Sequence, residues 1–264
     1  MNKITKLTAK NSSPRMANLG IVRAVTDAWS QAKDPNKRLL DLSCGGGLTS
    51  HMLAERGASV VATAYGGMAD MGDRILCVRG VDLNRSLPFR TASFDGVNIT
   101  EVIEHIENQA QLIREMARVL RADGSLVIST PNVLNVLSRL RFVFTGFLRG
   151  RVRPAHYSRR PEGAPNIYLL HFYELYYLLF HYGFEIEELR STKIKFAPVF
   201  FLPFLYPFMW IFSLVAVIHA EKDEVQKKYN WQILKHLFSR PLLFSDNIVV
   251  KARKKRLNII GSGA

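Results

Sequence analysis

Cysteine is scarce in this chain: only Cys44 and Cys77 occur among 264 residues, and their spacing matches no paired motif. Small secreted domains that depend on disulfides carry many more cysteines at regular spacings. Both cysteines lie in segments that we expect to be buried or at a strand end. The sequence therefore excludes a disulfide framework and indicates a reducing compartment.

Acidic residues are also few. The chain has 22 Asp and Glu residues against 36 Lys and Arg residues, which gives a formal net charge of +14. Such an excess favours an anionic partner, because the summed field attracts opposite charge. The composition therefore indicates nucleic acid, a phospholipid surface or a phosphorylated substrate.

Residues 196–220 contain no Asp, Glu, Lys or Arg. The run is long enough to span a bilayer, although Pro198, Pro203 and Pro207 are expected to break its first half. The strands predicted on either side should share one sheet, so the chain has to return to the same side. We therefore expect a re-entrant or in-plane membrane anchor, rimmed by Lys193, Lys195, Lys222, Lys227 and Lys228.

The anchor has two alternatives, an apolar cap over the active site and a dimer interface. Residues 1–15 lack the apolar core of a signal peptide. We therefore expect a protein on the cytoplasmic side of a membrane, with its oligomeric state left open.

Residues 38–47 organise the rest of the chain. A short apolar run ending in Asp41-Leu42 predicts a buried strand of a parallel sheet. Gly45 to Gly47 permit a sharp turn with close approach of a ligand. The predicted helix over 48–56 then points its free N–H groups back at that ligand. Such a strand, turn and helix form a nucleotide-binding corner.

A dinucleotide fits this corner poorly. Gly45 and Gly47 match the first two glycines of the Gly-x-Gly-x-x-Gly fingerprint, but Ser50 occupies the third position. No acidic residue ends the next predicted strand, which stops at Ala64.

The remaining pattern predicts a Rossmann-like, doubly wound α/β sheet of seven strands with helices on both faces, plus a hydrophobic insertion between the last two strands. Its expected segments are a tail and helix over 1–37, a core over 38–132, an Arg-rich insertion over 133–170, a helix and strand over 171–195, the hydrophobic insertion over 196–245, and a last strand with a basic tail over 246–264.

Two sets of residues resemble known families. The run from Asp41 to Gly47 resembles motif I of the class I S-adenosylmethionine (SAM)-dependent methyltransferases. Residues 38–132 resemble the methyltransferase type 11 group, which includes the ubiquinone-biosynthesis O-methyltransferases, through Ser93-Phe94-Asp95, Glu101-Val102-Ile103-Glu104-His105, Arg118-Val119-Leu120 and Gly124 to Asn132.

The resemblance implies SAM as the cofactor, with Asp82 accepting its adenine amino group. It places the cofactor contacts at Asp41, Ser43, Gly45, Gly47, Asp82 and Leu83. Most members hold the ribose with an acid where this chain has Ala64. Asp70 or Asp73 could replace that acid from the following loop, or Tyr65 could pack on the cofactor.

Glu101, Glu104 and His105 have the spacing of one helix face. This Glu-x-x-Glu-His pattern, with His171 before Phe172, resembles the small-RNA 2′-O-methyltransferases. The resemblance implies one divalent metal on Glu101, Glu104, His105 and His171, which would grip a substrate hydroxyl and lower its pKa. Two alternatives stay open: His105 as a metal-free base with Glu101 beside it, or acids that only suit a helix start.

Residues 133–168 carry many arginines against the single acid Glu162, which predicts an anionic substrate held by guanidinium groups. A solvated or membrane-facing basic surface is the alternative. The arginines are Arg139, Arg141, Arg149, Arg151, Arg153, Arg159 and Arg160.

Together these patterns predict SAM-dependent O-methylation of a membrane-associated acceptor, such as a lipid, a quinone or a lipid-linked sugar. An RNA 2′-O-methyltransferase is the enzymatic alternative. A catalytically silent, membrane-bound module is the alternative of another class, favoured by Ala64.

Overall fold

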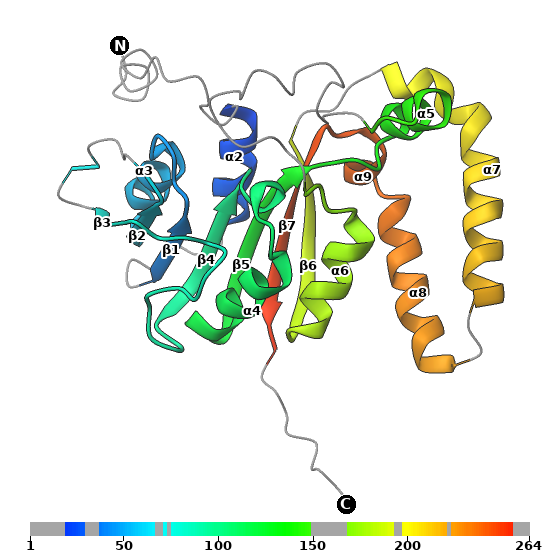
Figure 1. Ribbon diagram of the computed structural model, residues 1–264. Helices are drawn as coiled ribbons and strands as arrows, with labels where there is room; N and C mark the ends of the chain where they lie inside the picture. The colour runs from blue at the N-terminus through cyan, green and yellow to red at the C-terminus, as the bar shows by residue number, and fades with distance from the viewer. Residues whose placement is uncertain are drawn as a thin grey trace, which may run out of the picture.

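The computed structural model describes residues 19–29, 37–66, 71–72, 75–148, 168–192, 197–220 and 223–255. A seven-stranded sheet in the order β3-β2-β1-β4-β5-β7-β6 forms its centre (Figure 1). The first five strands run parallel, and β7 is antiparallel to both of its neighbours. The strands are β1 (Arg38–Leu42), β2 (Ser59–Ala64), β3 (Ile75–Arg79), β4 (Phe94–Thr100), β5 (Leu120–Pro131), β6 (Phe184–Ser191) and β7 (Asn247–Lys254).

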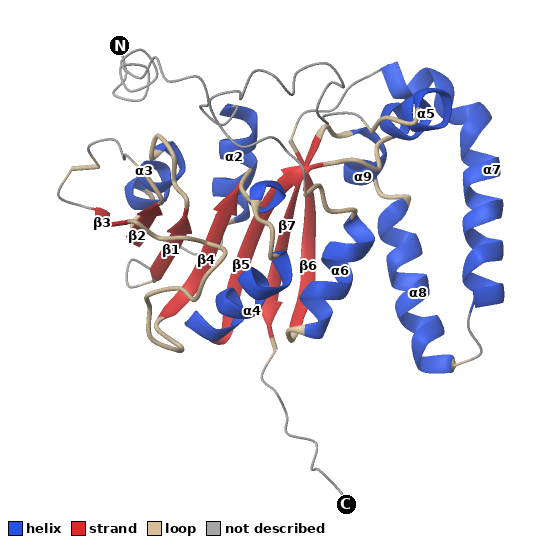
Figure 2. Ribbon diagram, in the orientation of Figure 1, coloured by secondary structure: helices blue, strands red, loops and turns tan. Residues whose placement is uncertain are grey.

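Helices cover both faces of the sheet (Figure 2). Successive side chains of a strand point to opposite faces, so β1 supplies Leu40 and Leu42 to one core and Leu39 to the other. The predicted doubly wound, Rossmann-like sheet is thereby confirmed. The helices are α2 (Leu19–Ala28), α3 (Leu48–Glu55), the 3-10 helix η1 (Ile103–His105), α4 (Gln109–Val119), α5 (Val136–Thr145), α6 (Phe172–His181), α7 (Ala197–Ala220), α8 (Glu224–Leu237) and α9 (Arg240–Phe244).

The third strand, β3, ends at Arg79, two residues before the buried Val81. Gly80 then adopts a φ of 72°, which turns the chain out of the strand. The amide of Val81 donates to the carbonyl of Ala64 at 3.2 Å. This bond keeps residues 81–83 beside the carboxyl end of β2.

The apolar run between β6 and β7 forms one helix, α7, so the expected break at its prolines is wrong. Pro203 and Pro207 lie inside the helix, and Pro198 is its second residue. A proline at the first turn costs no hydrogen bond, because that N–H has no partner within the helix. In Figure 1, α7 stands at the outer edge of the molecule, and α8 lies between it and α6.

Candidate cofactor and catalytic site

The glycine turn leaves β1 in an uncommon backbone conformation. Ser43, Gly45 and Gly47 all have positive φ values, of 55°, 54° and 78°. Thr63 on the neighbouring strand holds the turn: its hydroxyl accepts from the amide of Ser43 at 3.0 Å, and its carbonyl accepts from the amide of Cys44 at 2.9 Å. The predicted turn is therefore formed, and a serine occupies a left-handed position that usually favours glycine.

The space around Gly45 is open. A Cβ atom added there would meet no other atom within 4 Å, whereas one added at Gly47 would lie 2.2 Å from the sulfur of Met71. Gly45 thus borders room for a ligand at the start of α3, and its φ alone makes any side chain strained there. This is the arrangement that a cofactor crossing the turn requires.

Asp41 lies beneath the turn and is only 1% exposed. One carboxylate oxygen accepts from the hydroxyl of Ser50 at the start of α3, and the other accepts from the side-chain amide of Asn98 on β4 at 2.8 Å. Burial raises the pKa of Asp41 to about 6, although both hydrogen bonds oppose that shift. Asp41 therefore joins β1, α3 and β4 under the site. Its predicted contact with SAM stays a prediction.

Asp82 lies at the same edge of the sheet, in the loop that the Val81 bond ties to β2. Its carboxylate accepts from the amide of Asn84 at 2.9 Å and keeps part of its surface exposed. Leu83 beside it is buried in the core. A carboxylate can accept a hydrogen bond from an exocyclic amine, and the contact of Asp82 with SAM stays a prediction.

At the end of β2, Ala64 stands where the resemblance leads us to expect a ribose-binding acid, and the aromatic residue Tyr65 follows it. Ala64 is buried, and the next residue, Tyr65, is 74% exposed. Asp70 and Asp73, the other predicted replacements for the ribose-binding acid, lie outside the described residues.

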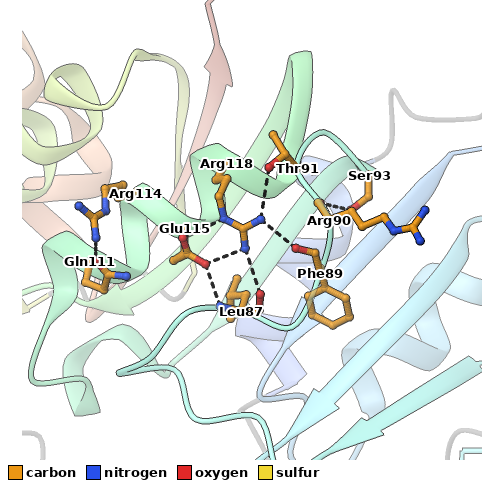
Figure 3. Close-up of polar contacts among 9 residues, drawn as sticks. All are labelled: Leu87, Phe89, Arg90, Thr91, Ser93, Gln111, Arg114, Glu115 and Arg118. Carbon is orange, nitrogen blue, oxygen red and sulfur yellow. Dashed lines mark hydrogen bonds and ion pairs between the residues drawn. The ribbon is translucent and has the colours of Figure 1, made fainter.

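An ion pair fixes the loop between Asp82 and β4 (Figure 3). The guanidinium group of Arg118 donates to the carbonyls of Leu87 and Phe89 at 3.0 and 2.8 Å. The carboxylate of Glu115 accepts from the guanidinium group of Arg118 at 2.7 Å and from the amide of Leu87 at 2.8 Å. These bonds, Arg118 first, hold the pKa of Glu115 below its ordinary value. The family resemblance included Arg118, but its role in clamping this loop was missed.

Glu101 follows β4 directly and joins three strands. Its φ is 54°, and its amide donates to the carbonyl of Ser129 on β5 at 3.1 Å. Its carboxylate accepts from the hydroxyl of Ser129 at 2.9 Å and from the side-chain amide of Asn247 on β7. Because Leu42 pairs with Ile99, this cluster lies at the same sheet edge as the glycine turn.

A second carboxyl group lies close to Glu101. Glu104 is 1% exposed, and its nearest hydroxyl partner, Thr130, is 3.5 Å away. Burial raises the pKa of both carboxyl groups, and the charge of Glu101 raises the pKa of Glu104 further. Burial and mutual repulsion therefore disfavour the state in which both carboxyl groups are ionised.

The predicted helix face is wrong. Glu101 lies outside any helix, because its positive φ turns the chain, and only Ile103–His105 form a short 3-10 helix. His105 ends that helix and is partly exposed at the edge of the sheet, while Glu104 points into the core.

The predicted metal set is therefore not assembled. Among the described residues, which include Glu101, Glu104, His105 and His171, no three His, Cys, Asp or Glu side chains gather as metal ligands. His171 instead begins α6, where its ring nitrogen lies 3.2 Å from Glu174 in a capping box. The start of α6 also borders a shallow groove lined by Leu170, Tyr173, Glu174, Tyr177 and Leu178.

Two of the arginines of the predicted insertion lie on α5. Arg139 donates its Nε to the carbonyl of Leu134 at 2.6 Å, and burial lowers its pKa to about 10. Arg141 is exposed. The five arginines from 149 to 160 lie outside the described residues, so the anionic-substrate role stays a prediction.

Comparison with known proteins matches this site to one domain family. Residues 40–128 match the model of a methyltransferase domain, the type 11 group. A ubiquinone biosynthesis O-methyltransferase of Hahella chejuensis is 36% identical over 112 residues, which are 37% of this chain and 44% of that protein. A probable SAM-dependent methyltransferase of Mycobacterium tuberculosis is 38% identical over 97 residues, 36% of this chain and 35% of that protein.

Solved structures agree on the fold. A SAM-dependent methyltransferase from Archaeoglobus fulgidus superposes with a TM-score of 0.54 at 17% identity, covering 90% of this chain and 95% of that chain. The [4+2]-cyclase SpnF has the same score and identity, covering 93% of this chain and 85% of that chain. The fold alone thus does not fix the reaction. The chain matches less than half the length of the curated relatives above.

Proposed function

We propose that this chain, which carries a class I SAM-dependent methyltransferase domain, transfers a methyl group from SAM to an oxygen of a membrane-associated acceptor. SAM is the cofactor of this domain. The acceptor is a lipid, a quinone or a lipid-linked sugar. The curated relatives named for ubiquinone biosynthesis support an acceptor of this kind.

One observation carries the choice of a membrane-associated acceptor. Phe200–Ile218 form a 19-residue stretch of α7 with a mean hydropathy of 2.1, and the rest of the protein fully buries none of these residues. An enzyme for a soluble acceptor has no use for so much uncovered apolar surface, which costs solubility. An enzyme that meets its acceptor at a membrane can use this surface to contact the lipid.

The residues at the sheet edge have distinct parts in this proposal. Gly45 and Gly47 let SAM cross the turn, the start of α3 faces its charged end, and Asp82 accepts the adenine amine. Bound SAM supplies an activated methyl group, so the protein has to orient the acceptor and remove its proton. His105, partly exposed at the end of η1, is the proposed proton acceptor. Glu101, held by Ser129 and Asn247, fixes the backbone that leads to it.

Methyl-labelled SAM tests the proposal. The protein is incubated with a total membrane fraction, and the label is followed separately into the organic extract and into RNA. We expect label in the organic extract. Treatments that cleave methyl ethers or methyl esters should release it. Label in RNA instead would establish the 2′-O-methyltransferase alternative. Tight SAM binding with no transfer to either fraction would favour the silent module.

A further inference from the structure

The outer side of α7 is apolar and uncovered. Phe200, Phe204, Phe208 and Phe212 recur at every fourth position and are each at least 64% exposed. This spacing places them along one side of the helix. The opposite side packs on the protein, where Tyr206 and Trp210 contact Phe238 with ring centroids 5.3 and 4.9 Å apart. Water-facing helices normally carry polar residues on the side that α7 leaves apolar.

A second helix extends this surface. The last turn of α5 exposes Phe142, Val143 and Phe144, of which Phe144 is 81% exposed. α5 and α7 contact each other, and Figure 1 shows α5 beside the upper part of α7. α5 follows β5, whose end forms part of the candidate site. The exposed aromatic residues of the two helices therefore belong to adjoining surfaces, and one helix leads to the site.

α7 packs against α8, and α8 in turn packs against α6. α8 is bound to α6 by the hydrogen bond from Tyr176 to Gln232 at 2.9 Å and by the ring contact of Phe180 with Tyr229 at 4.6 Å. β6 and β7 are paired at Ser191 and Ile248, so the chain leaves and re-enters the sheet at one point. For α7 to cross a bilayer, α8 would have to cross back.

Such a return crossing is unfavourable. α8 carries Lys227, Lys228 and Lys235, and insertion of charged side chains at the centre of a bilayer is strongly disfavoured. A helix packed on one side and apolar on the other instead suits the plane of the membrane interface. Its apolar stretch of 19 residues has a length of about 28 Å.

We propose that the exposed sides of α5 and α7, the α5–α7 platform (Phe142, Phe144, Phe200, Phe204, Phe208 and Phe212), dock in the plane of one leaflet of a lipid bilayer. The inference rests on the proposed function and adds the surface, the orientation and the part of α5. The net charge of +14 favours a leaflet with anionic headgroups, because basic proteins gain attraction there. Docking through α5 brings the leaflet to the substrate side of the methyltransferase site.

Three matched substitutions test the platform. Phe208→Glu changes α7, Phe144→Glu changes α5, and Leu76→Glu changes an equally exposed apolar residue, 61% exposed, on β3. Figure 1 shows β3 at the opposite end of the molecule from α7. Binding of the full chain to vesicles of phosphatidylcholine with a minority of phosphatidylglycerol is measured by co-sedimentation. Calorimetric SAM binding by each variant reports that it is folded.

We expect Phe208→Glu and Phe144→Glu each to weaken vesicle binding about tenfold or more, because each replaces an exposed aromatic side chain that docking would bury in lipid. Leu76→Glu should stay within about twofold of the parent. Loss in Phe208→Glu alone would remove α5 from the platform. No vesicle binding by the parent, with concentration-dependent dimers that Phe208→Glu dissociates, would assign the surface to a second copy of the chain.

Orientation has its own test, in a Cys44→Ser, Cys77→Ser background with Glu224→Cys at the start of α8. Docking in one leaflet leaves this cysteine open to a membrane-impermeant maleimide added outside sealed vesicles. Protection until detergent is added would show a crossing and overturn the in-plane arrangement. Methyl transfer to a lipid acceptor in detergent, without vesicle binding, would leave the proposed function standing and remove only the platform.

Discussion

At the scale of single residues, Glu104 combines deep burial with a neighbouring acid, and this combination has a pH signature. Its pKa is raised from 4.5 to about 8, mainly by burial. Because folding raises this pKa, the protonated carboxyl group contributes stability that is fully present below about pH 4.5. That contribution is lost as the pH rises through about 8. The wild-type protein should therefore lose stability across this range because the buried pair becomes ionised.

Glu104→Gln removes that ionisation. We expect the variant to match the parent near pH 5 and to be more stable by about 1–3 kcal/mol near pH 9. Urea unfolding at the two pH values measures the difference. Glu185→Gln, at an exposed carboxylate that pairs with Lys255, serves as the control and should show no such trend. A Glu104→Gln variant that is less stable at the higher pH would refute the buried pair.

Arg118 is the second residue whose contacts make a sharp prediction. Arg118→Ala leaves Glu115 without its ion-pair partner and frees the carbonyls of Leu87 and Phe89. We expect a loss of about 2–4 kcal/mol in the free energy of unfolding, since truncation leaves a largely buried acid unpaired. Lys227→Ala removes an exposed pair with Glu224 and should cost less than about 1 kcal/mol. Equal losses in the two variants would contradict the clamp.

His105 is the residue on which the proposed chemistry depends. His105→Gln should lower the rate of methyl transfer about 10²- to 10⁴-fold, the usual contribution of a positioned general base. SAM binding should be unchanged, because the cofactor's proposed contacts lie mainly in the glycine turn and in the loop after β3. Transfer at the parental rate by this variant would remove His105 from the mechanism.

At the scale of elements, the start of α6 offers a test between two roles of His171, a helix cap and a metal ligand. His171 and Glu174 close a capping box at its start. His171→Ser keeps a good N-cap and should change stability by less than about 1 kcal/mol, with methyl transfer intact. A metal ligand would behave differently, because its loss abolishes activity along with that of its partners. Thermal unfolding and transfer assays of the one variant distinguish the two roles, and a large loss of transfer would reopen the metal hypothesis.

Among the elements, some could be predicted from the sequence and others could not. β1, β6 and β7 lie where the sequence patterns put them. β1 is a short, buried apolar run, whereas β6, the last strand of the sheet, alternates Phe184 and Ile186 with acidic residues. The turn at Glu101 could not be predicted, since nothing near it indicates that an acid adopts a positive φ. Its partner Asn247 lies 146 residues later in the chain. Likewise, no local signal indicates that α7 continues through Pro203 and Pro207.

At the scale of the whole molecule, the methyltransferase core and the apolar helices occupy different parts of one architecture. The glycine turn lies on the β1 side of the sheet, and α7 stands beyond β6 at the other end (Figure 1). α5 connects the two, since it follows β5 and contacts α7. The proposed cofactor site and the proposed α5–α7 platform therefore lie apart, with α5 linking them.

Cofactor binding is the claim on which every other part rests, and calorimetry tests it most directly. We predict that the parent binds SAM and its demethylated product, S-adenosylhomocysteine. Gly45→Leu should abolish both, because the new side chain fills the open space of the turn in a strained backbone position. The control Gly146→Ala also substitutes a positive-φ glycine, the C-cap residue that follows α5, and should bind normally. Tight binding of a nicotinamide dinucleotide by the parent, with none of SAM, would contradict the account.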